Sequence, residues 1–435
     1  MKTILRTLAI ITALSCGAYA QFSFDGGKMP SARDIEVPQV SGPASAAAAT
    51  PAVQPKEWTV MVMLAGQNDL ASNAVIDLNE METVGSSDKV NIVAEIGLGN
   101  AGSARLLVYK DADTKKVSSP LISIDKTADT GDYRRVIDFA KWAKQTYPAK
   151  HYLFVMWNHG SGVNDPLDPP GRKTKGINFN YNNGNYVRNP QLAKIMAEAG
   201  PVDILAFDAC LMQMAEIAFE VKDYARYIVA SEEVVPVAGF PYDAFLKSLN
   251  DNPAMDAAQL SRAIVASFKD YYSKTGDGVQ LSAIRADKVA GLGSLMADFA
   301  AAAREANDTA ALGAGIKGVI RYQIKRPLQI SYSGDVGHFA GLTAAGAGDK
   351  LKEKGAALKR YITDELVLAN AELGKNQLGQ EYTLSTGIAV YLPPFTKISR
   401  ENVEEMFETK YDGTSLAFNR AVAWNDFLPL LYNSR

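Results

Sequence analysis

The stretch Tyr152-Leu-Phe-Val-Met-Trp-Asn-His-Gly-Ser-Gly162 joins an apolar strand directly to a turn of small and polar residues. An unbroken apolar run of this length is typical of a strand buried on both faces of a parallel sheet. The same junction recurs where Val202-Asp-Ile-Leu-Ala-Phe207 runs into Asp208-Ala-Cys-Leu-Met212. Because an open α/β sheet places its chemistry beyond the carboxyl ends of its strands, we expect His159 and Cys210 on adjacent loops if these strands are neighbours.

The surrounding pattern supports an α/β fold with a mostly parallel sheet covered on both faces. Apolar runs predict strands at 58–64, 90–96, 105–110 and 227–230, and helical spacing predicts helices at 68–84, 132–147, 190–199 and 211–224. Beyond residue 245 we expect helices at 259–273 and 286–306 and strands at 280–284 and 387–392. This second half is either a separate subdomain or an extension of the same sheet.

Composition narrows the classes of function. The 435 residues are 47% apolar and 21% charged, with a net charge of −3, which argues against nucleic-acid binding driven by bulk charge. Two cysteines and three histidines are too few for a disulfide scaffold or a structural zinc site. Two G-x-G-x-x-G matches, at 97–102 and 313–318, lack the strand–turn–helix context of a nucleotide site, and we interpret both as structural.

The N-terminus has the form of a secretory signal peptide over residues 1–20. Lys2 and Arg6 precede a short apolar run, and Ala18-Tyr-Ala20 supplies the small-x-small end. A buried N-terminal helix is the alternative, and lipid anchoring at Cys16 fits less well because alanine stands where a larger aliphatic residue is usual. Residues 21–56 are predicted to be a linker or pro-segment. We therefore expect a secreted or periplasmic protein without a membrane span, whose remaining cysteine is Cys210.

The types of residue at the two strand ends suit nucleophilic catalysis. A thiol reacts as the thiolate, and a helix N-terminus beside a histidine lowers its pKa. The N–H groups of Gly160 and Cys210 are candidates for holding an oxyanion. Taken singly, Cys210 is better explained as an inert buried cysteine, and His159 as a turn histidine; their occurrence together at matching strand ends favours chemistry. His151 precedes its strand and falls at the opposite edge, while His338 has no evident partner.

At these junctions the sequence resembles the clostripain family of cysteine peptidases, which shares a caspase-like fold with gingipains, legumains and separases. The resemblance rests on segments in family order: 58–70, 158–162, 208–213, and 230–233 with 239–242. The resemblance covers about residues 57–245, and residues 387–393 also resemble the family. It implies a caspase-like αβα sandwich with a mostly parallel central sheet at 57–245 and a C-terminal α/β subdomain at 246–435.

By this resemblance, Cys210 is the nucleophile and His159 the base of a dyad, and cleavage follows Arg or Lys. The resemblance also places Asp208 at the floor of the pocket for the basic side chain; the alternative is that Asp208 caps the following helix. Relatives can carry a second acid where this chain has Ala238, so the choice between Arg and Lys stays open, with Glu232 or Glu233 as substitutes for that acid.

The resemblance further implies a zymogen that processes itself between the histidine and cysteine segments. Gly171-Arg-Lys-Thr-Lys-Gly176 offers Arg172, Lys173 and Lys175 as cleavage sites, and an uncut basic loop is the alternative. Some relatives need calcium, although no D-x-D-x-D-G loop is present and we assign no metal ligand. The expected partners are proteins or peptides with Arg or Lys at the cleaved bond. The rival functions are an inactive relative that acts as an envelope or surface binding protein, and a transpeptidase.

Overall fold

The computed structural model describes residues 54–163, 165–166, 176–323, 331–393, 409–410 and 416–432. The predicted signal peptide, Cys16 and nearly all of the predicted linker lie outside these residues. The cleavage candidates Arg172, Lys173 and Lys175 lie outside them as well. No helix within the described residues is long and apolar enough to cross a membrane.

A nine-stranded sheet runs through the described part of the chain in the order β14-β11-β10-β9-β5-β1-β2-β3-β4. The central strands are parallel: β1 (Lys56–Leu64), β2 (Val90–Gly97), β5 (Ala149–Trp157), β9 (Val202–Asp208) and β10 (Ala225–Ala230). Antiparallel strands flank them on both sides: β3 (Ser103–Leu107), β4 (Leu121–Asp125), β11 (Val279–Arg285) and β14 (Val367–Leu373). The expected mostly parallel central sheet is confirmed.

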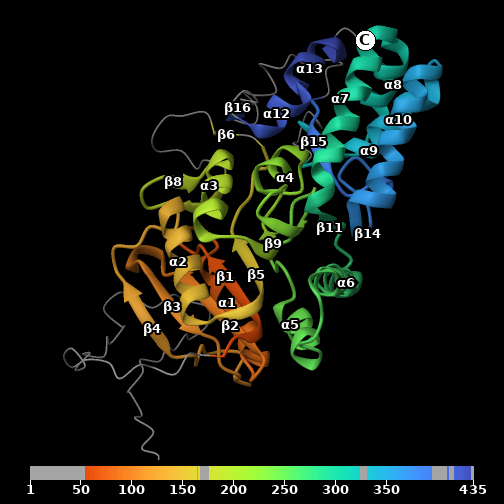
Figure 1. Cartoon of the computed structure of the whole chain (residues 1–435). Coiled ribbons are helices and arrows are strands. Elements are labelled where there is room, and N and C mark those ends of the chain that lie inside the picture. The colour runs from red at the N-terminus through yellow and green to blue at the C-terminus, as the bar shows by residue number, and fades with distance from the viewer. Residues whose placement is uncertain are drawn as a thin grey trace, which may run out of the picture.

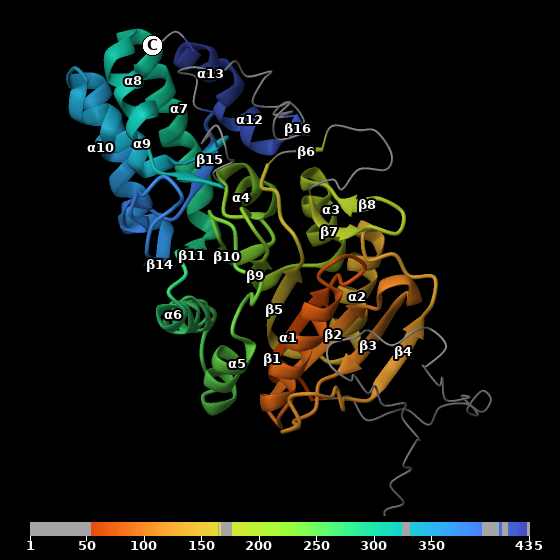
Figure 2. The same ribbon diagram turned by 180° about the vertical axis from the view of Figure 1, so that it is seen from behind.

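Helices cover both faces of this sheet, as Figures 1 and 2 show from opposite sides. Phe154 and Met156 of β5 enter one core, whereas Leu153 and Val155 enter the other, because alternate side chains of a strand point to opposite faces. The first core packs under α2 (Tyr133–Thr146), α3 (Asn189–Ala199), α4 (Ala215–Val221) and α7 (Val289–Ala306). The second packs under α1 (Ala71–Val84), α5 (Tyr242–Asp251) and α6 (Ala257–Thr275).

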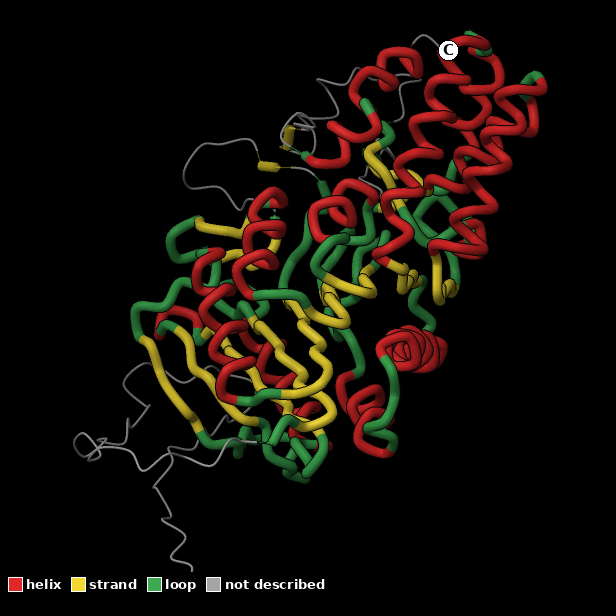
Figure 3. The backbone as a smooth tube through the Cα atoms, in the orientation of Figure 1, coloured by secondary structure: helices red, strands yellow, loops and turns green. Residues whose placement is uncertain are grey.

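The C-terminal half extends the sheet that the N-terminal half begins, since β11 pairs with β10 and β14 pairs with β11. Figure 3 shows most of its helices gathered past that edge, far from β4. They are α7 with α8 (Thr309–Gly318), α9 (Val336–Gly346), α10 (Asp349–Tyr361), α12 (Ala417–Val422) and α13 (Trp424–Tyr432). A small sheet of β12 (Arg321–Tyr322), β13 (Ser333–Asp335) and β15 (Ala389–Tyr391) lies beside α4.

Shorter elements complete the description. They are β6 (Asp165–Pro166) paired with β16 (Thr409–Lys410), the hairpin of β7 (Ile177–Asn180) and β8 (Asn185–Val187), η1 (Gly99–Ala101), η2 (Ala286–Lys288), η3 (Ile362–Leu366) and η4 (Tyr382–Leu384). The two G-x-G-x-x-G matches are structural, as expected: the first joins β2 to the antiparallel β3, and the second lies within α8. In α8, a Cβ on Gly315 would lie 2.2 Å from Thr343 Oγ1, so this glycine permits close helix packing.

One predicted helix starts later in the structure than the sequence indicates. The sequence predicts a helix over 211–224, but α4 begins at Ala215, and Leu211 has a φ of +65°. A left-handed residue cannot belong to a right-handed helix, so no helix starts at Leu211. The backbone is held there because the N–H groups of Leu211 and Gln213 donate to the carbonyls of Glu233 and Ser231, at 3.1 and 2.9 Å.

Candidate active site

The two junction loops lie side by side. Strands β5 and β9 pair in parallel with Trp157 opposite Asp208, and the N–H of Asn158 donates to the carbonyl of Asp208 at 3.2 Å. His159 and Cys210 each follow two residues after that aligned pair. The structure therefore brings together, at the carboxyl edge of the central strands, the two residues that the sequence singled out.

The backbone of Gly160 lies directly against the backbone of Cys210. A Cβ on Gly160 would stand 2.1 Å from the carbonyl oxygen and 3.0 Å from the nitrogen of Cys210, so glycine alone fits here. The N–H of Gly160 also hydrogen-bonds the Cys210 thiol. A backbone donor thus points at the sulfur, next to the place where an attacked carbonyl would develop negative charge.

Cys210 is half-buried and forms no disulfide within the described residues, and its Sγ donates to the carbonyl oxygen of Val235 at 3.9 Å. Burial raises the pKa of this thiol to about 11, so the resting side chain is protonated at neutral pH. The sequence placed Cys210 at a helix N-terminus, and this is wrong because α4 starts only at Ala215. The thiolate therefore forms at neutral pH only with the help of a base, and Cys210 lies five residues before the first residue of α4.

The loop that carries Cys210 is held by the C-terminal half of the chain. Leu211, in the left-handed region, donates its N–H to the carbonyl of Glu233. The buried Glu233 carboxylate accepts from the backbone N–H of Gln323 and from the hydroxyl of Tyr382, both at 2.8 Å. Residues far along the sequence thereby fix the strained backbone beside Cys210.

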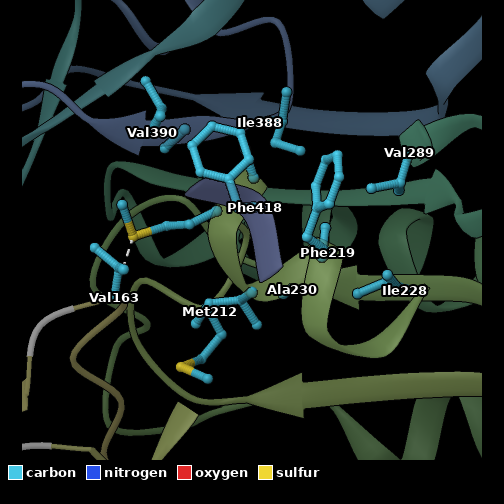
Figure 4. Packing of buried hydrophobic residues seen from close by; sticks show 14 of the residues in the cluster. Val163, Met212, Phe219, Ile228, Ala230, Val289, Ile388, Val390 and Phe418 are labelled. Atoms are coloured by element: carbon cyan, nitrogen blue, oxygen red, sulfur yellow. Dashed lines mark hydrogen bonds between the residues drawn. The ribbon is translucent and has the colours of Figure 1, made fainter. Parts of the chain in front are cut away.

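Figure 4 shows the packing around this loop. Met212 lies in the same apolar cluster as Val163, which follows the His159 turn, and as Ile388 and Phe418 from the C-terminal half. The N–H of Val163 also donates to the sulfur of Met214 at 3.3 Å, drawn there as a dashed line. One rigid core therefore supports both junction loops.

His159 is about one-third exposed, and its Nε2 lies 2.8 Å from Oδ1 of Asp69. Its ring stacks on Tyr181 at a centroid distance of 6.2 Å and meets the edge of Phe179 at 6.4 Å. The other histidines lie elsewhere: Nδ1 of His151, at the start of β5, is 3.1 Å from Asp203, and His338 is in α9.

Asp208 is 4% exposed, and its Oδ2 accepts from the N–H of Phe240 at 3.0 Å and from the hydroxyl of Tyr242 at 3.1 Å. Gly239 lies over the carboxyl group, since a Cβ there would stand 2.9 Å from Oδ2. Burial raises the pKa of Asp208 to about 7. The capping alternative is wrong, because the N-terminus of α4 has no side-chain cap and Asp208 faces residues 239–242 instead.

Two further carboxyl groups, which the sequence did not single out, lie behind Asp208. Asp77 accepts from Nε1 of Trp157 at 2.5 Å, and Glu80 accepts from the N–H of Tyr242 at 3.2 Å. Burial, together with the charge of Asp208, raises the pKa of Asp77 well above its usual range, and burial raises the pKa of Glu80 to about 7. Asp77 and Glu80 are three residues apart on α1, so both lie on one helix face. This spacing is the sequence signal that could have identified them.

Glu232 and Glu233, the residues offered as substitutes for a second acid, both accept hydrogen bonds from the C-terminal half. Glu232 is fully buried and accepts from Ser385, and Glu233 accepts from Tyr382 and from the Gln323 backbone. Both carboxyl groups are thus engaged with the C-terminal half. Within the described residues, no group of three or more His, Cys, Asp or Glu side chains is arranged to hold a metal ion, and we derive no step through calcium.

Comparisons with known proteins agree with this geometry. The sequence model of the clostripain family matches residues 62–430. Clostripain of Hathewaya histolytica is 28% identical over 215 residues, which are 42% of this chain and 40% of that protein; the match thus spans less than half the length of this curated relative.

Solved structures share the fold. A secreted C11 cysteine protease from Bacteroides thetaiotaomicron, in complex with an irreversible peptide inhibitor, superposes with a TM-score of 0.64 at 20% identity. An inactive zymogen C11 protease from Parabacteroides distasonis superposes with the same TM-score at 17% identity. Each comparison covers 85% of this chain and 99% of the other.

Proposed function

This chain belongs to the clostripain family, and from that premise we propose that it is a secreted cysteine endopeptidase that cleaves after Arg or Lys. The observation that carries the proposal is the parallel register of β5 and β9, which sets the His159 and Cys210 loops side by side. Acyl transfer requires a nucleophile, a base and a hydrogen-bond donor for the oxyanion. The backbone N–H of Gly160, directed at the thiol, is the candidate for that donor.

In the proposed reaction, His159 takes the proton of the Cys210 thiol, and Sγ attacks the carbonyl carbon of the scissile bond. The N–H groups of Gly160 and Cys210 stabilise the oxyanion that forms. The C–N bond then breaks, the leaving amine takes the proton from His159, and an acyl-enzyme remains. Water attacks this thioester and gives a proton to His159, the C–S bond breaks, and the thiol regains its proton.

The proposal is tested with fluorogenic peptides that end in Arg, Lys, Asp or Asn, each measured with and without a thiol alkylator. Cleavage after Arg or Lys that the alkylator blocks supports the proposal. No cleavage of any peptide by the processed chain supports an inactive binding protein instead. A free amine acceptor then separates hydrolysis from peptide transfer, because a transferase would form the amide in preference to the acid.

Asp208 is expected to make cleavage after basic residues depend on pH. Its pKa lies at about 7, so the carboxyl group is neutral below that pH and charged above it. Only the charged form makes a charge-assisted bond to guanidinium or ammonium. We expect kcat/KM for Arg peptides to fall about tenfold per pH unit below that pKa, relative to an isosteric citrulline peptide.

The matched variant is Asp208→Asn. At about pH 8 it should lose about tenfold to a hundredfold in kcat/KM for Arg peptides, the loss of one charged hydrogen bond. The pKa of Asp208 is raised in the folded state, so the neutral carboxyl group favours folding, and this contribution is lost as the pH rises toward 7. At about pH 8 the Asp208→Asn variant should therefore not have a lower Tm than wild type. A lower Tm with unchanged preference for Arg would refute the pocket role.

We also propose that the enzyme processes itself within Gly171–Gly176. The segment follows the His159 loop in the sequence, and Arg172, Lys173 and Lys175 match the proposed specificity. Mass spectrometry of purified wild type should show two associated chains cut near Lys173, whereas Cys210→Ala should remain a single chain. Identical nicking of the Cys210→Ala protein, or a single chain in fully active wild type, contradicts this.

A further inference from the structure

A carboxylate that the sequence analysis did not assign lies against the histidine. Oδ1 of Asp69 is 2.8 Å from Nε2 of His159, and the two residues are ninety positions apart in the chain. We propose that Asp69 is a positioning residue that holds His159 in the tautomer and orientation needed for catalysis, assisted by Tyr181. The inference rests on the proposed function, and it extends the Cys210/His159 dyad by a third member.

The segment that carries Asp69 is fixed by its neighbours. Asn68 accepts from the N–H of Leu70 at 2.9 Å and donates to the carbonyl of Phe179 at 2.8 Å. The N–H of Tyr181 donates to the carbonyl of Gln67 at 2.9 Å. These bonds tie the end of β1 to the β7–β8 hairpin, so that Asp69 and Tyr181 approach His159 from two anchored segments.

The chemistry of the pair selects one tautomer. A carboxylate only accepts hydrogen bonds, so Nε2 of His159 must carry the proton in the contact with Asp69. In the neutral ring, Nδ1 is then the unprotonated nitrogen, free to take a proton. Without Asp69 the ring can populate both tautomers and turn about its side-chain bonds, and only part of the population is competent.

Tyr181 supports both the carboxylate and the ring. Its hydroxyl hydrogen-bonds Asp69, and its ring stacks on that of His159 at an interplanar angle of 15°. Burial and the nearby Asp69 charge raise the pKa of Tyr181 to about 12, so the hydroxyl stays a donor. Asp69 itself is 56% exposed, so its replacement should disturb the position of His159 more than the folding of the chain.

The test compares Asp69→Ala and Asp69→Glu with wild type on an Arg peptide. We expect Asp69→Ala to lower kcat about tenfold to a hundredfold with KM changed less than about twofold, as for loss of orientation of a general base. Asp69→Glu keeps an acceptor-only carboxylate at an exposed position and should recover at least part of that loss. Asp298→Ala is the matched control, because Asp298 is 55% exposed and ion-paired at 2.9 Å to Lys354 on distant helices.

A second readout does not depend on peptidase activity. In a Cys210→Ala chain with ¹⁵N-labelled histidine, the Nε2–H proton of His159 should be protected from exchange, and Asp69→Ala should abolish this signal. With three histidines, a His159→Ala spectrum assigns it. Wild-type kcat in Asp69→Ala, a loss confined to KM, or an unchanged Nε2–H signal would overturn the inference. Inactivity of wild type on every peptide would instead count against the proposed function.

Discussion

Cys210→Ala is expected to reduce peptide cleavage to the background of the assay, a loss of about 10⁵-fold or more, because removing a covalent nucleophile removes the acyl-enzyme route. In the mature protein an alkylating reagent should label Cys210 alone, since the chain has two cysteines and Cys16 belongs to the predicted signal peptide. Rates on an Arg peptide, with mass mapping of the labelled residue, measure both effects.

The control for this experiment concerns folding. The Cys210 side chain is half-buried at the margin of the core, so alanine should change Tm little, and Cys210→Ser, which keeps the size of the side chain, should change it less. Both variants should be inactive, because a serine hydroxyl is a far weaker nucleophile than a thiol in a site built for sulfur. Full activity in Cys210→Ala would end the cysteine-peptidase hypothesis.

The two junctions between strand and loop could be predicted from the sequence. They depend on a local apolar pattern and on the rule that parallel strands end at the same edge of a sheet. The apolar runs that become β5 and β9 have no other stable place than the middle of a sheet, and parallel strands end at the same edge. The loops that carry His159 and Cys210 therefore lie side by side, as the neighbouring strands require. The further step, that Gly160 lies against Cys210, follows from the same register, since only glycine leaves the room that two touching backbones need.

Contacts between segments that are far apart in the sequence could not be predicted from such local patterns. Leu211 and Met212 resemble the first turn of a helix, but Leu211 has a left-handed backbone that is held by bonds to residues 231 and 233. Asp69 belongs to a segment whose resemblance was recognised, yet nothing local indicates that its carboxylate reaches His159. Likewise, β11 and β14 join the sheet by antiparallel pairing, and apolar pattern does not fix the order of strands.

The loop that carries Cys210 is anchored from the C-terminal half of the chain. Glu233 joins the Leu211 backbone to Tyr382, and Tyr332 donates to the carbonyl of Ser161 at 2.9 Å. Both junction loops thus depend on residues beyond 245. A preorganised site needs such support, because backbone donors that shift by a fraction of an ångström lose most of their effect on a developing oxyanion.

His159→Ala is expected to lower kcat about a hundredfold or more, the usual effect of removing a general acid–base group. The reason is specific to this chain: burial raises the pKa of Cys210 to about 11, so the thiol needs a partner to remove its proton at neutral pH. His159 is the histidine whose loop lies against that of Cys210. Steady-state kinetics on an Arg peptide, with Tm as a check of folding, measure the effect.

His151→Ala is the matched control for the same chemistry at the other end of the same strand. His151 is 31% exposed, close to the 33% of His159, and its ring also contacts an aspartate, Asp203, at 3.1 Å. It packs against Trp58 with a centroid distance of 5.0 Å, so its loss should cost about 1 kcal/mol of stability and change kcat less than about twofold. Because the two histidines differ chiefly in which strand end they occupy, equal losses in kcat would show that position at the carboxyl edge is not what makes His159 the base.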